Sequence, residues 1–359
     1  MSAFAALLTT LQPQNILACF IGALVGTLVG VLPGVGPTAT MALLLPLTFS
    51  LGPTAGLIML AGIWYGAQYG GSTTSILVNV PGESASVVTT LEGYKMARKG
   101  RAGAALAAAA IGSFVAGTIS VIALQLFAPP LANAALAFGS AEYFSIALLG
   151  LILLSNLTGK SYLKSLTMAL VGVMLSTVGM DPVAGVERFT FNVVDLLSGF
   201  GFVPVVMGLF GVAEILRSIE EADQQVEVMK VRFRDLYPTK EELKRSLPPM
   251  FRGGVLGFLI GLLPGPAATL ASFVSYAYER RFGKHREEFG TGAIEGVAGP
   301  EAANNAACAG GLVPLLALGL PFAPPTAILL SGLMIHGVSP GPLLMQNSRR
   351  RGKGQPQGQ

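Results

Sequence analysis

The sequence from Ala102 to Ala141 reads AGAALAAAAIGSFVAGTISVIALQLFAPPLANAALAFGSA and contains no charged side chain. A helix needs about 20 mostly apolar residues to cross the roughly 30 Å of hydrocarbon in a bilayer. Residues 143–159, 165–180 and 196–213 are also uncharged and long enough, or nearly long enough, to cross. These segments predict an all-α integral membrane protein.

The composition of the whole chain favours the same class. Of the 359 residues, 52% are hydrophobic and only 12% are charged, whereas soluble domains carry about 25% charged residues. A water-exposed globule is therefore excluded. The net charge of +4 does not indicate a nucleic-acid partner, because the basic residues are grouped between the apolar segments.

The positions of the basic residues predict the membrane topology. Lys and Arg are absent before position 95 and then gather in residues 95–101, 160–164, 217–252, 280–286 and 349–353. Short loops rich in Lys and Arg mark the cytoplasmic side. Loops 129–142 and 181–195 contain a single basic residue, Arg188, and are expected on the outer side of the membrane. The expected course of the spans is 102–127 outward, 143–156 inward, 162–180 outward and 198–216 inward.

Two halves of the chain resemble each other. Gly30-Val31-Leu32-Pro33-Gly34-Val35-Gly36-Pro37 matches Gly261-Leu262-Leu263-Pro264-Gly265-Pro266, and Asn79-Val80-Pro81-Gly82 has a weaker counterpart in Gly319-Leu320-Pro321-Phe322. Pro and Gly break a helix, and such a break within lipid must be buried in protein or line a wet cavity. Interrupted segments at corresponding positions of two repeats indicate a transporter binding site.

A second observation concerns the spacing of Arg252 and Arg280. Both are expected on the cytoplasmic side, but they are separated by fewer than the roughly 40 residues that two full spans need. Either the chain crosses once and residues 280–286 lie outside, or residues 253–278 form a re-entrant hairpin with its tip at Pro264-Gly265-Pro266. We favour the hairpin.

We therefore predict about nine or ten membrane segments in two repeats, with Gly/Pro-broken helices or re-entrant hairpins. The predicted divisions are a first membrane repeat with scaffold helices (1–216), a cytoplasmic linker (217–252), a second, incomplete membrane repeat (253–347) and a polar tail (348–359).

Motifs of nucleotide and metal enzymes are not matched. The glycine-rich stretch 30–40 lacks the Lys of a phosphate-binding loop, since Pro37 stands in its place. His285 and His336 have no evident Cys or carboxylate partner that would form a metal site. We expect no catalytic residue, no metal, no cofactor and no enzymatic activity.

The segment Gly70-Gly71-Ser72-Thr73-Thr74-Ser75 places four consecutive hydroxyls in an apolar block. Such hydroxyls need partners at membrane depth. They either support helix packing and local hydrogen bonds or bind a ligand. Glu301-Ala302-Ala303-Asn304-Asn305 is similarly open to two interpretations, a capped helix N-terminus or a matching wall of the site.

The expected binding mode follows from the absence of Lys and Arg in these segments. Hydroxyls, amides and the N-termini of broken helices would hold an anion, and carbonyl ends of the breaks could hold Na⁺. Glu83 and Glu301 are functional candidates as intramembrane acids, or they lie at the interface. We predict that the site lies where residues 30–37, 71–86, 261–266 and 304–321 converge.

Several ordered motifs resemble one transporter family. Gly30–Thr38, Gly70–Gly82, Glu92-Gly93-Tyr94-Lys95-Met96-Ala97, Gly319-Leu320-Pro321 and Leu333–Pro342 are similar to the tripartite tricarboxylate transporters, large membrane subunit. The resemblance implies a cation-coupled secondary transporter, driven by Na⁺ or H⁺, that imports citrate or related carboxylates. It further implies a periplasmic solute-binding protein, a small membrane subunit and a multi-pass location in the bacterial inner membrane.

Two departures from the family pattern leave alternatives open. Members are usually longer, and Phe322-Ala323-Pro324 stands where the first half has Gly82-Glu83-Ser84. The alternatives are a truncated, non-transporting scaffold or assembly subunit, a dicarboxylate transporter of another binding-protein-dependent family, and an intramembrane enzyme.

The predicted site residues fall into two groups. The substrate-binding group is Gly71, Ser72, Thr73, Thr74, Ser75, Asn79, Pro81, Gly82, Ser84, Asn304 and Asn305. The group that binds the cation or breaks the backbone is Pro33, Gly34, Gly36, Thr38, Pro264, Gly265 and Pro321.

Overall fold

The computed structural model describes residues 8–32, 36–157, 161–181, 185–201, 204–205, 207–213, 216, 237–342 and 344. Among these residues the only strands are β1 (Gly179–Met180) and β2 (Glu187–Arg188), which pair antiparallel. The remaining regular elements are helical. The architecture is therefore all-α, as the uncharged segments predict.

The helices of the first half begin mostly at prolines. Proline has the φ angle of a helix, and its missing N–H is not needed in the first turn. Pro13, Pro37 and Pro53 accordingly start α2, α3 and α4. In chain order the helices up to residue 216 are α2 (Pro13–Gly30), α3 (Pro37–Leu44), η1 (Leu45–Ser50), α4 (Pro53–Val78), η2 (Ser84–Ser86), α5 (Val87–Arg98), α6 (Ala102–Ala135), α7 (Ser140–Leu157), α8 (Tyr162–Ser176), η3 (Val194–Ser198) and η4 (Met207–Val212).

The second half has a shorter set of helices. Thr239 begins the first of them with a reciprocal capping box, in which its side chain accepts from the N–H of Glu242 and the Glu242 side chain accepts from the N–H of Thr239. The set consists of α11 (Lys240–Gly261), α12 (Ala267–Phe282), η6 (Arg286–Glu288), α13 (Glu295–Leu318) and α14 (Pro324–Ile335).

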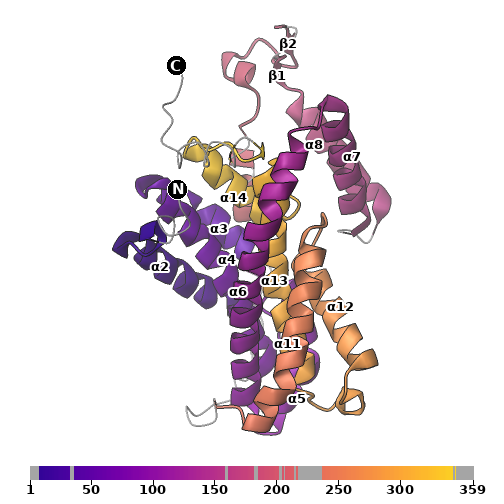
Figure 1. Ribbon diagram of the computed structural model, residues 1–359. Coiled ribbons are helices and arrows are strands. Elements are labelled where there is room, and N and C mark those ends of the chain that lie inside the picture. Colours follow the sequence, from indigo (N-terminus) through magenta and orange to yellow (C-terminus); the bar gives the residue numbers. More distant parts are fainter. Residues whose placement is uncertain are drawn as a thin grey trace.

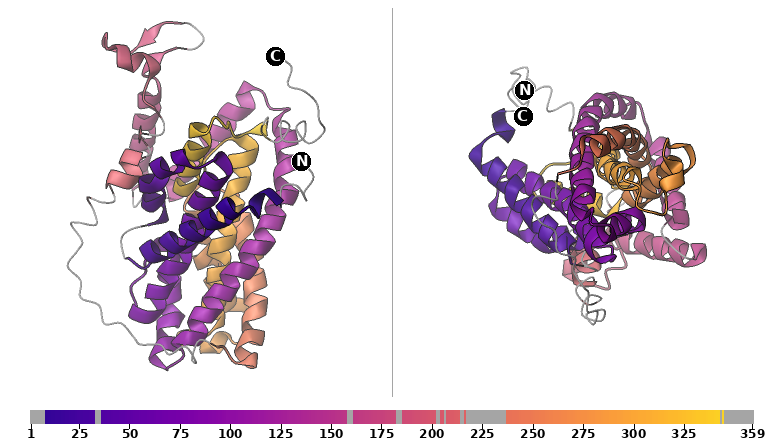
Figure 2. Two further views of the ribbon diagram at one scale, coloured as in Figure 1. Left: turned by 90° about the vertical axis from the view of Figure 1, so that its left-hand side faces the viewer. Right: turned by 90° about the horizontal axis from the view of Figure 1, so that it is seen from below.

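Helix α13 is the central element of the molecule. It runs between α6, α11 and α12, while α2, α3 and α4 form a layer on another side (Figure 1, Figure 2). Its contact with α6 is built from alanines such as Ala105 and Ala109 on α6 and Ala298 and Ala302 on α13, all fully buried. Small side chains let membrane helices approach closely.

Glycines bring α2 against α4 backbone to backbone. A Cβ added to Gly22 would lie 2.3 Å from the carbonyl oxygen of Met59, and one added to Gly26 would lie 2.2 Å from that of Ile63. Neither position has room for any other residue.

The same arrangement recurs between α11 and α13. A Cβ added to Gly253 would lie 2.3 Å from the carbonyl oxygen of Gly299, and one added to Gly257 would lie 2.1 Å from that of Ala303. Gly261 continues the series one turn later, at 2.4 Å from the carbonyl oxygen of Ala307. This parallel supports the two-repeat organisation, which stays a prediction.

Four interruptions separate α2 from α3, α4 from α5, α11 from α12 and α13 from α14. Asn79 and Gly319, which the sequence comparison of the halves aligns, end α4 and α13 in the left-handed conformation, with φ of 58° and 77°. The interruptions approach one another in pairs. Gly82 packs on the Gly30 carbonyl, and the Gly265 N–H donates to the Phe322 carbonyl at 2.9 Å.

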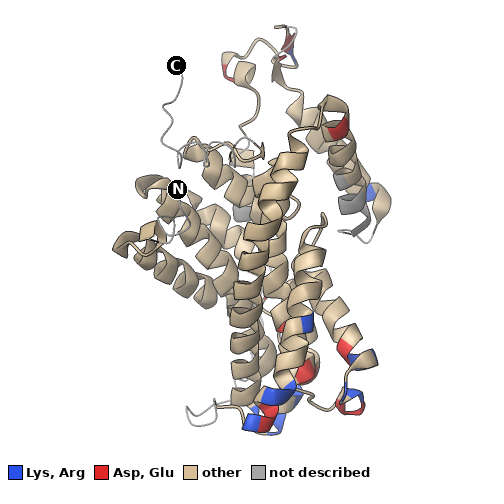
Figure 3. Cartoon of the chain, viewed as in Figure 1, with Lys and Arg blue, Asp and Glu red and all other residues tan. Residues whose placement is uncertain are grey.

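Helices α11 and α12 form the predicted hairpin with its turn at residues 262–266. Arg252 on α11 pairs with Glu279 on α12 at 2.8 Å, so the two basic ends lie side by side. Charged residues gather at the end where α11 begins and α5 and α12 end (Figure 3). The hairpin is confirmed, whereas its depth in a membrane stays a prediction.

Several predicted boundaries differ from the structure. Helix α6 continues through Pro129 and Pro130 to Ala135, although we predicted a loop from residue 129. The continuation buries Ala128, Ala132 and Ala135, and this packing offsets the hydrogen bonds that the prolines cannot make. The linker boundary predicted at Arg252 falls inside α11, because the Thr239 cap starts that helix earlier.

The region after α7 also departs from the predicted spans. Helix α8 ends at Ser176, and Gly179 and Met180 belong to the strand pair instead of the predicted span 162–180. Gly179 has a φ of 120°, which a helix does not accommodate. Within the predicted span 198–216, η4 is a six-residue π-helix among residues that are only partly described. Residues 217–236 and the polar tail lie outside the described residues.

Two helices of the described part, α2 and α6, are long and apolar enough to cross a bilayer by length and composition. Shorter apolar helices occupy residues 37–50, 140–149, 162–176 and 324–335. The number of nine or ten membrane segments stays a prediction.

Candidate functional site

A cavity of about 480 Å³ lies where the four interruptions meet. Residues 36–38, 81–84, 266–269 and 323–325 supply its walls, one group from each interruption. The rest of the lining consists of Trp64 and Gln68 of α4, Val87 of α5, and Ala307, Cys308 and Gly311 of α13. The cavity overlaps each of the four predicted ranges in part, but residues 267–269 and 323–325 of its lining lie beyond them. The binding site itself stays a prediction.

Three helices begin at the cavity. Gly36, Pro266 and Ala323 are the N-caps of α3, α12 and α14, and each of them lines the cavity. The first-turn N–H groups of a helix have no intrahelical acceptor, and the macrodipole makes this end positive. Among the described residues that line the cavity none is Lys or Arg. The helix N-termini are therefore the groups of positive partial charge in this lining.

The N–H groups of Thr38, Ala268 and Thr269 are the best placed of these donors. All three residues line the cavity and lie in the first turn of α3 or α12. Helix α14 contributes fewer donors, because Pro324 and Pro325 have no N–H.

Glu83 is the acidic residue of the cavity lining. Its carboxylate caps η2 by accepting from the N–H of Ala85 at 2.9 Å. Gln68, in the amide orientation that its surroundings require, donates to both Glu83 oxygens at 2.7 and 3.2 Å. Gly71 leaves the space for this side chain, since a Cβ there would lie 2.8 Å from Cγ of Glu83.

One polar contact joins the two halves across the cavity. The Ser84 and Thr269 hydroxyls lie 2.8 Å apart, on the second and third interruptions. Both are exposed. A ligand in the cavity would meet hydroxyls from both halves of the chain.

Behind the cavity, Glu301 forms a separate polar cluster inside the helix bundle. It is fully buried and lies within hydrogen-bond distance of Ser72, Thr89 and Asn304, which belong to α4, α5 and α13. Asn305 adds a hydrogen bond to Ser113 of α6 at 2.7 Å. Glu301, Asn304 and Asn305 lie within α13, so the alternative of a capped helix N-terminus is wrong.

The predicted site residues thus separate into distinct places. Those that line the cavity are Gly36, Thr38, Pro81, Gly82 and Ser84. Ser72, Asn304 and Asn305 belong to the Glu301 cluster. Gly71 packs against Glu83, while Asn79, Pro264, Gly265 and Pro321 shape the helix ends and turns. Pro33 and Gly34 lie outside the described residues.

Three of the predicted hydroxyls are used locally. Thr73 donates to the Tyr69 carbonyl, and Thr74 and Ser75 donate to the Gly71 carbonyl, all at 3.0 to 3.1 Å. These bonds fit the alternative of local bonding within a packed helix. None of the three residues lines the cavity.

Sequence reasoning missed Gln68 and Thr269. A single polar residue in a helix gives no signal by itself. Thr269 lies three residues after Pro266, so the break itself could have pointed to it.

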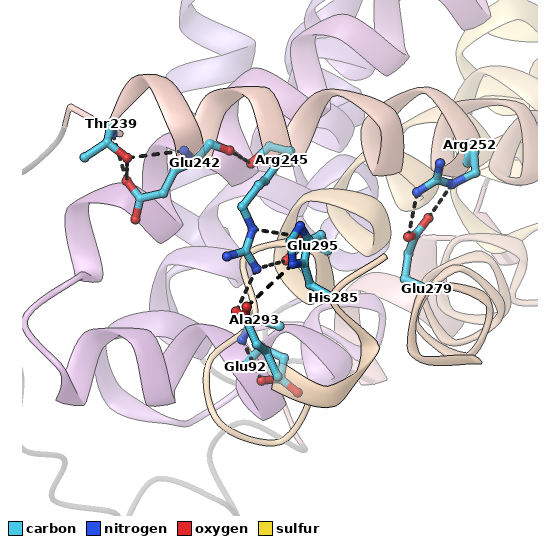
Figure 4. Close-up of polar contacts among 11 residues, drawn as sticks. Glu92, Thr239, Glu242, Arg245, Arg252, Glu279, His285, Ala293 and Glu295 are labelled. Atoms are coloured by element: carbon cyan, nitrogen blue, oxygen red, sulfur yellow. Dashed lines mark hydrogen bonds and ion pairs between the residues drawn. The ribbon is translucent and has the colours of Figure 1, made fainter. Parts of the chain in front are cut away.

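At the charged end, Glu92 of α5 holds the loop before α13. It accepts from Tyr276 and from the N–H groups of Gly290 and Gly292. It also accepts from the N–H of Ala293, which lies beside it (Figure 4). This side chain is fully buried. The contacts fasten the first half of the chain to the second.

Arg245 joins the start of α11 to the same loop. It bonds Glu295 at 2.8 Å and Glu288 at 2.7 Å (Figure 4). The hydrogen bond from Arg245 holds the pKa of Glu288, which lies outside the membrane segments, below its ordinary value.

Comparison with known proteins gives the chain a family. The family model described as the tripartite tricarboxylate transporter TctA family matches residues 16–351. The chain belongs to this family. This TctA-family chain is accordingly an all-α membrane protein.

Two relatives come from Agrobacterium vitis. One, described as an uncharacterized 52.8 kDa protein in the TAR-I ttuC' 3'region, is 54% identical over 335 residues, which are 93% of this chain and 66% of the relative. The other, described as an uncharacterized protein in the TAR-II ttuC' 3'region, is 51% identical over 86 residues, which are 24% of this chain and 36% of the relative. The TctA-family chain therefore spans about two thirds of the first relative. No solved structure matches it.

Proposed function

We propose that the chain is the substrate-binding membrane subunit of a secondary transporter that imports tricarboxylates or related small carboxylates. Family membership supports the substrate class. The observation that carries the proposal is the convergence of three helix N-termini on one cavity with no basic side chain among its described lining residues.

The chemistry of the cavity suits a carboxylate that must be released again. Each helix N-terminus contributes about 0.3–1 kcal/mol toward an anion, and up to about 2 kcal/mol where it is partly buried. A Lys or Arg side chain would bind the carboxylate more strongly but would slow its release. Hydroxyls of Thr38, Ser84 and Thr269 add uncharged hydrogen-bond donors to the same space.

The proposal includes the partners and the setting that the family implies. A periplasmic solute-binding protein would deliver the substrate, and a small membrane subunit would complete the complex in the bacterial inner membrane. A coupling cation would supply the driving force, and no chemical conversion takes place. The charged end would then face the cytoplasm, as basic residues do in membrane proteins.

A binding measurement tests the proposal directly. Trp64 is the single tryptophan of the chain and lines the cavity, so its fluorescence reports on a ligand there. We expect citrate to change this signal saturably. In the Ala268→Pro variant one first-turn N–H is removed without any change in charge. The affinity should fall by roughly 10- to 150-fold, since a hydrogen bond to a charged group contributes about 1.5–3 kcal/mol.

The matched control places the same substitution away from the cavity. Leu163→Pro lies at the second position of α8, is exposed and does not line the cavity. We expect it to leave citrate binding unchanged. Equal citrate affinities for wild type and Ala268→Pro would contradict the proposed role of the helix N-termini, and an absence of any citrate response would contradict the proposed function.

A further inference from the structure

Glu301 is a buried carboxyl group with no cationic partner among the described residues. It is fully buried in the second turn of α13. The described ion pairs of the charged end involve Arg101, Arg245 and Arg252, and each of these arginines pairs with a carboxylate other than Glu301. An unpaired charge at such a site costs so much free energy that the group usually takes up a proton instead.

One contact of Glu301, that with Ser72, fits the protonated form, while Thr89 and Asn304 donate to the same carboxyl group. The Ser72 hydroxyl lies 2.5 Å from Oε2 of Glu301 and 3.0 Å from the backbone carbonyl oxygen of Gln68. A serine hydroxyl has one proton, and the carbonyl can only accept. If Ser72 donates to Gln68, the proton between Ser72 and Glu301 must come from Glu301.

Glu83 provides the contrast within the same chain. Its partners are the backbone N–H of Ala85 and the amide nitrogen of Gln68, both of which only donate. The contacts of Glu83 are therefore with donors only, whereas Glu301 also faces a hydroxyl oxygen that can accept. The two acids near the cavity thus differ in what their neighbours can accept.

We propose that Glu301 is the binding site of the coupling ion and that this ion is a proton. The proposal rests on the proposed transport function and names its coupling. A proton from water on one side converts the carboxylate to the acid, and the same proton leaves to water on the other side. No electron transfer or other bond change is involved.

The connection to the substrate cavity runs along one turn of α4. When Glu301 loses its proton, Ser72 must turn its hydroxyl toward the carboxylate and release the Gln68 carbonyl. Gln68 lines the cavity, and its side chain holds Glu83. Protonation of a group that no ligand touches would in this way change the lining of the cavity.

The other titratable groups near Glu301 are few. Tyr69 of α4 and Glu83 interact with it electrostatically, and α5 and α6 present the hydroxyls of Thr89 and Ser113. Cys308 lies two turns further along α13. On α11 and α12, Arg252 and Glu279 pair with each other, and α14 contains no charged residue.

Infrared difference spectroscopy tests the proposal without partners or substrate. The complete chain in lipid nanodiscs is taken through a pH change, and the carbonyl stretch of a protonated carboxylic acid is followed. We expect a band that is absent in the isosteric variant Glu301→Gln and retained in the control Glu83→Gln. Loss of the band in Glu83→Gln and not in Glu301→Gln would overturn the assignment.

Transport in proteoliposomes separates this inference from the proposed function. The chain, with its binding protein and small subunit, is assayed for citrate exchange at equal pH and for citrate accumulation driven by a pH gradient. Glu301→Gln should keep exchange and lose accumulation, since its cavity lining is unchanged. Wild type without exchange would refute the proposed function.

Two results would refute the proton site alone. One is accumulation by Glu301→Gln that equals that of wild type. The other is accumulation driven by a sodium gradient at constant pH, together with loss of the carboxylic acid band when sodium is added. A variant that fails to fold is recognised by its unfolding curve, and the nearly isosteric Ser72→Ala then serves as the second test, because it should change the pH at which the band appears.

Discussion

The contact between α11 and α13 allows a stability change to be estimated from distances. In Gly257→Ala the new Cβ would lie 2.1 Å from the carbonyl oxygen and 2.7 Å from the Cα of Ala303. Favourable contacts between such atoms are about 3.5–4.0 Å long, so the helices would have to separate by roughly 1 Å. The obstructing atoms belong to backbone and cannot rotate away.

The expected free energy follows from two opposing terms. Overpacking of this kind costs about 1–3 kcal/mol and occasionally more. Alanine in place of a helical glycine returns about 0.5–1 kcal/mol. Because three backbone atoms of Ala303 lie within 3 Å, we expect the upper part of the cost and a net destabilisation of about 1–2 kcal/mol.

The assay compares two glycines that differ only in their surroundings. Gly172 lies in α8, and no atom lies within 4 Å of a Cβ added there. Denaturant unfolding in one detergent, followed by circular dichroism, should place Gly257→Ala below wild type and Gly172→Ala at or slightly above it. Equal unfolding midpoints for the two variants would refute the packing argument.

Three further predictions concern polar contacts. Gly71→Ala should displace the Glu83 side chain, which would lie 2.8 Å from the new Cβ, and should weaken citrate binding in the Trp64 fluorescence assay; unchanged binding would contradict it. Glu92→Gln should destabilise the chain by about 2–4 kcal/mol, because several hydrogen bonds to a buried charged acceptor are lost or weakened, and limited proteolysis should cut the loop 283–292 sooner than in wild type. Because the pKa of Glu288 is lowered in the folded chain, its contribution to stability is present above its ordinary pKa of 4.5 and is lost as the pH falls. Glu288→Gln should therefore make the stability of the chain fall slightly less steeply at acid pH. A plot of stability against pH as steep as that of wild type would assign the slope to other groups.

Local sequence rules were sufficient to predict where the helices are interrupted. Pro264, Gly265 and Pro266 stop a helix by their own covalent structure, so the hairpin and its turn could be predicted. The four breaks at corresponding positions of two similar halves also led to the predicted binding site, which stays a prediction. The first-turn donors of α3 and α12 are a direct result of where those helices begin.

The features that sequence missed depend on distant parts of the chain. Ser72 and Thr89 meet Glu301 across more than 200 positions of sequence, and no local pattern contains that information. Helix α6 passes through Pro129 and Pro130 because its alanines are buried against neighbours, a tertiary effect that outweighs the local rule. The capture of the loop 290–293 by Glu92 is likewise visible only in the fold.

The attachment at Glu92 has a consequence for how the halves can move. Helix α5 begins at the second interruption, beside the cavity, and ends at the charged end, where Glu92 ties it to the loop before α13. A tie of this kind acts as a pivot. A small rotation about it would displace the cavity walls by an amount that grows with their distance from the pivot, while the charged end would stay nearly fixed.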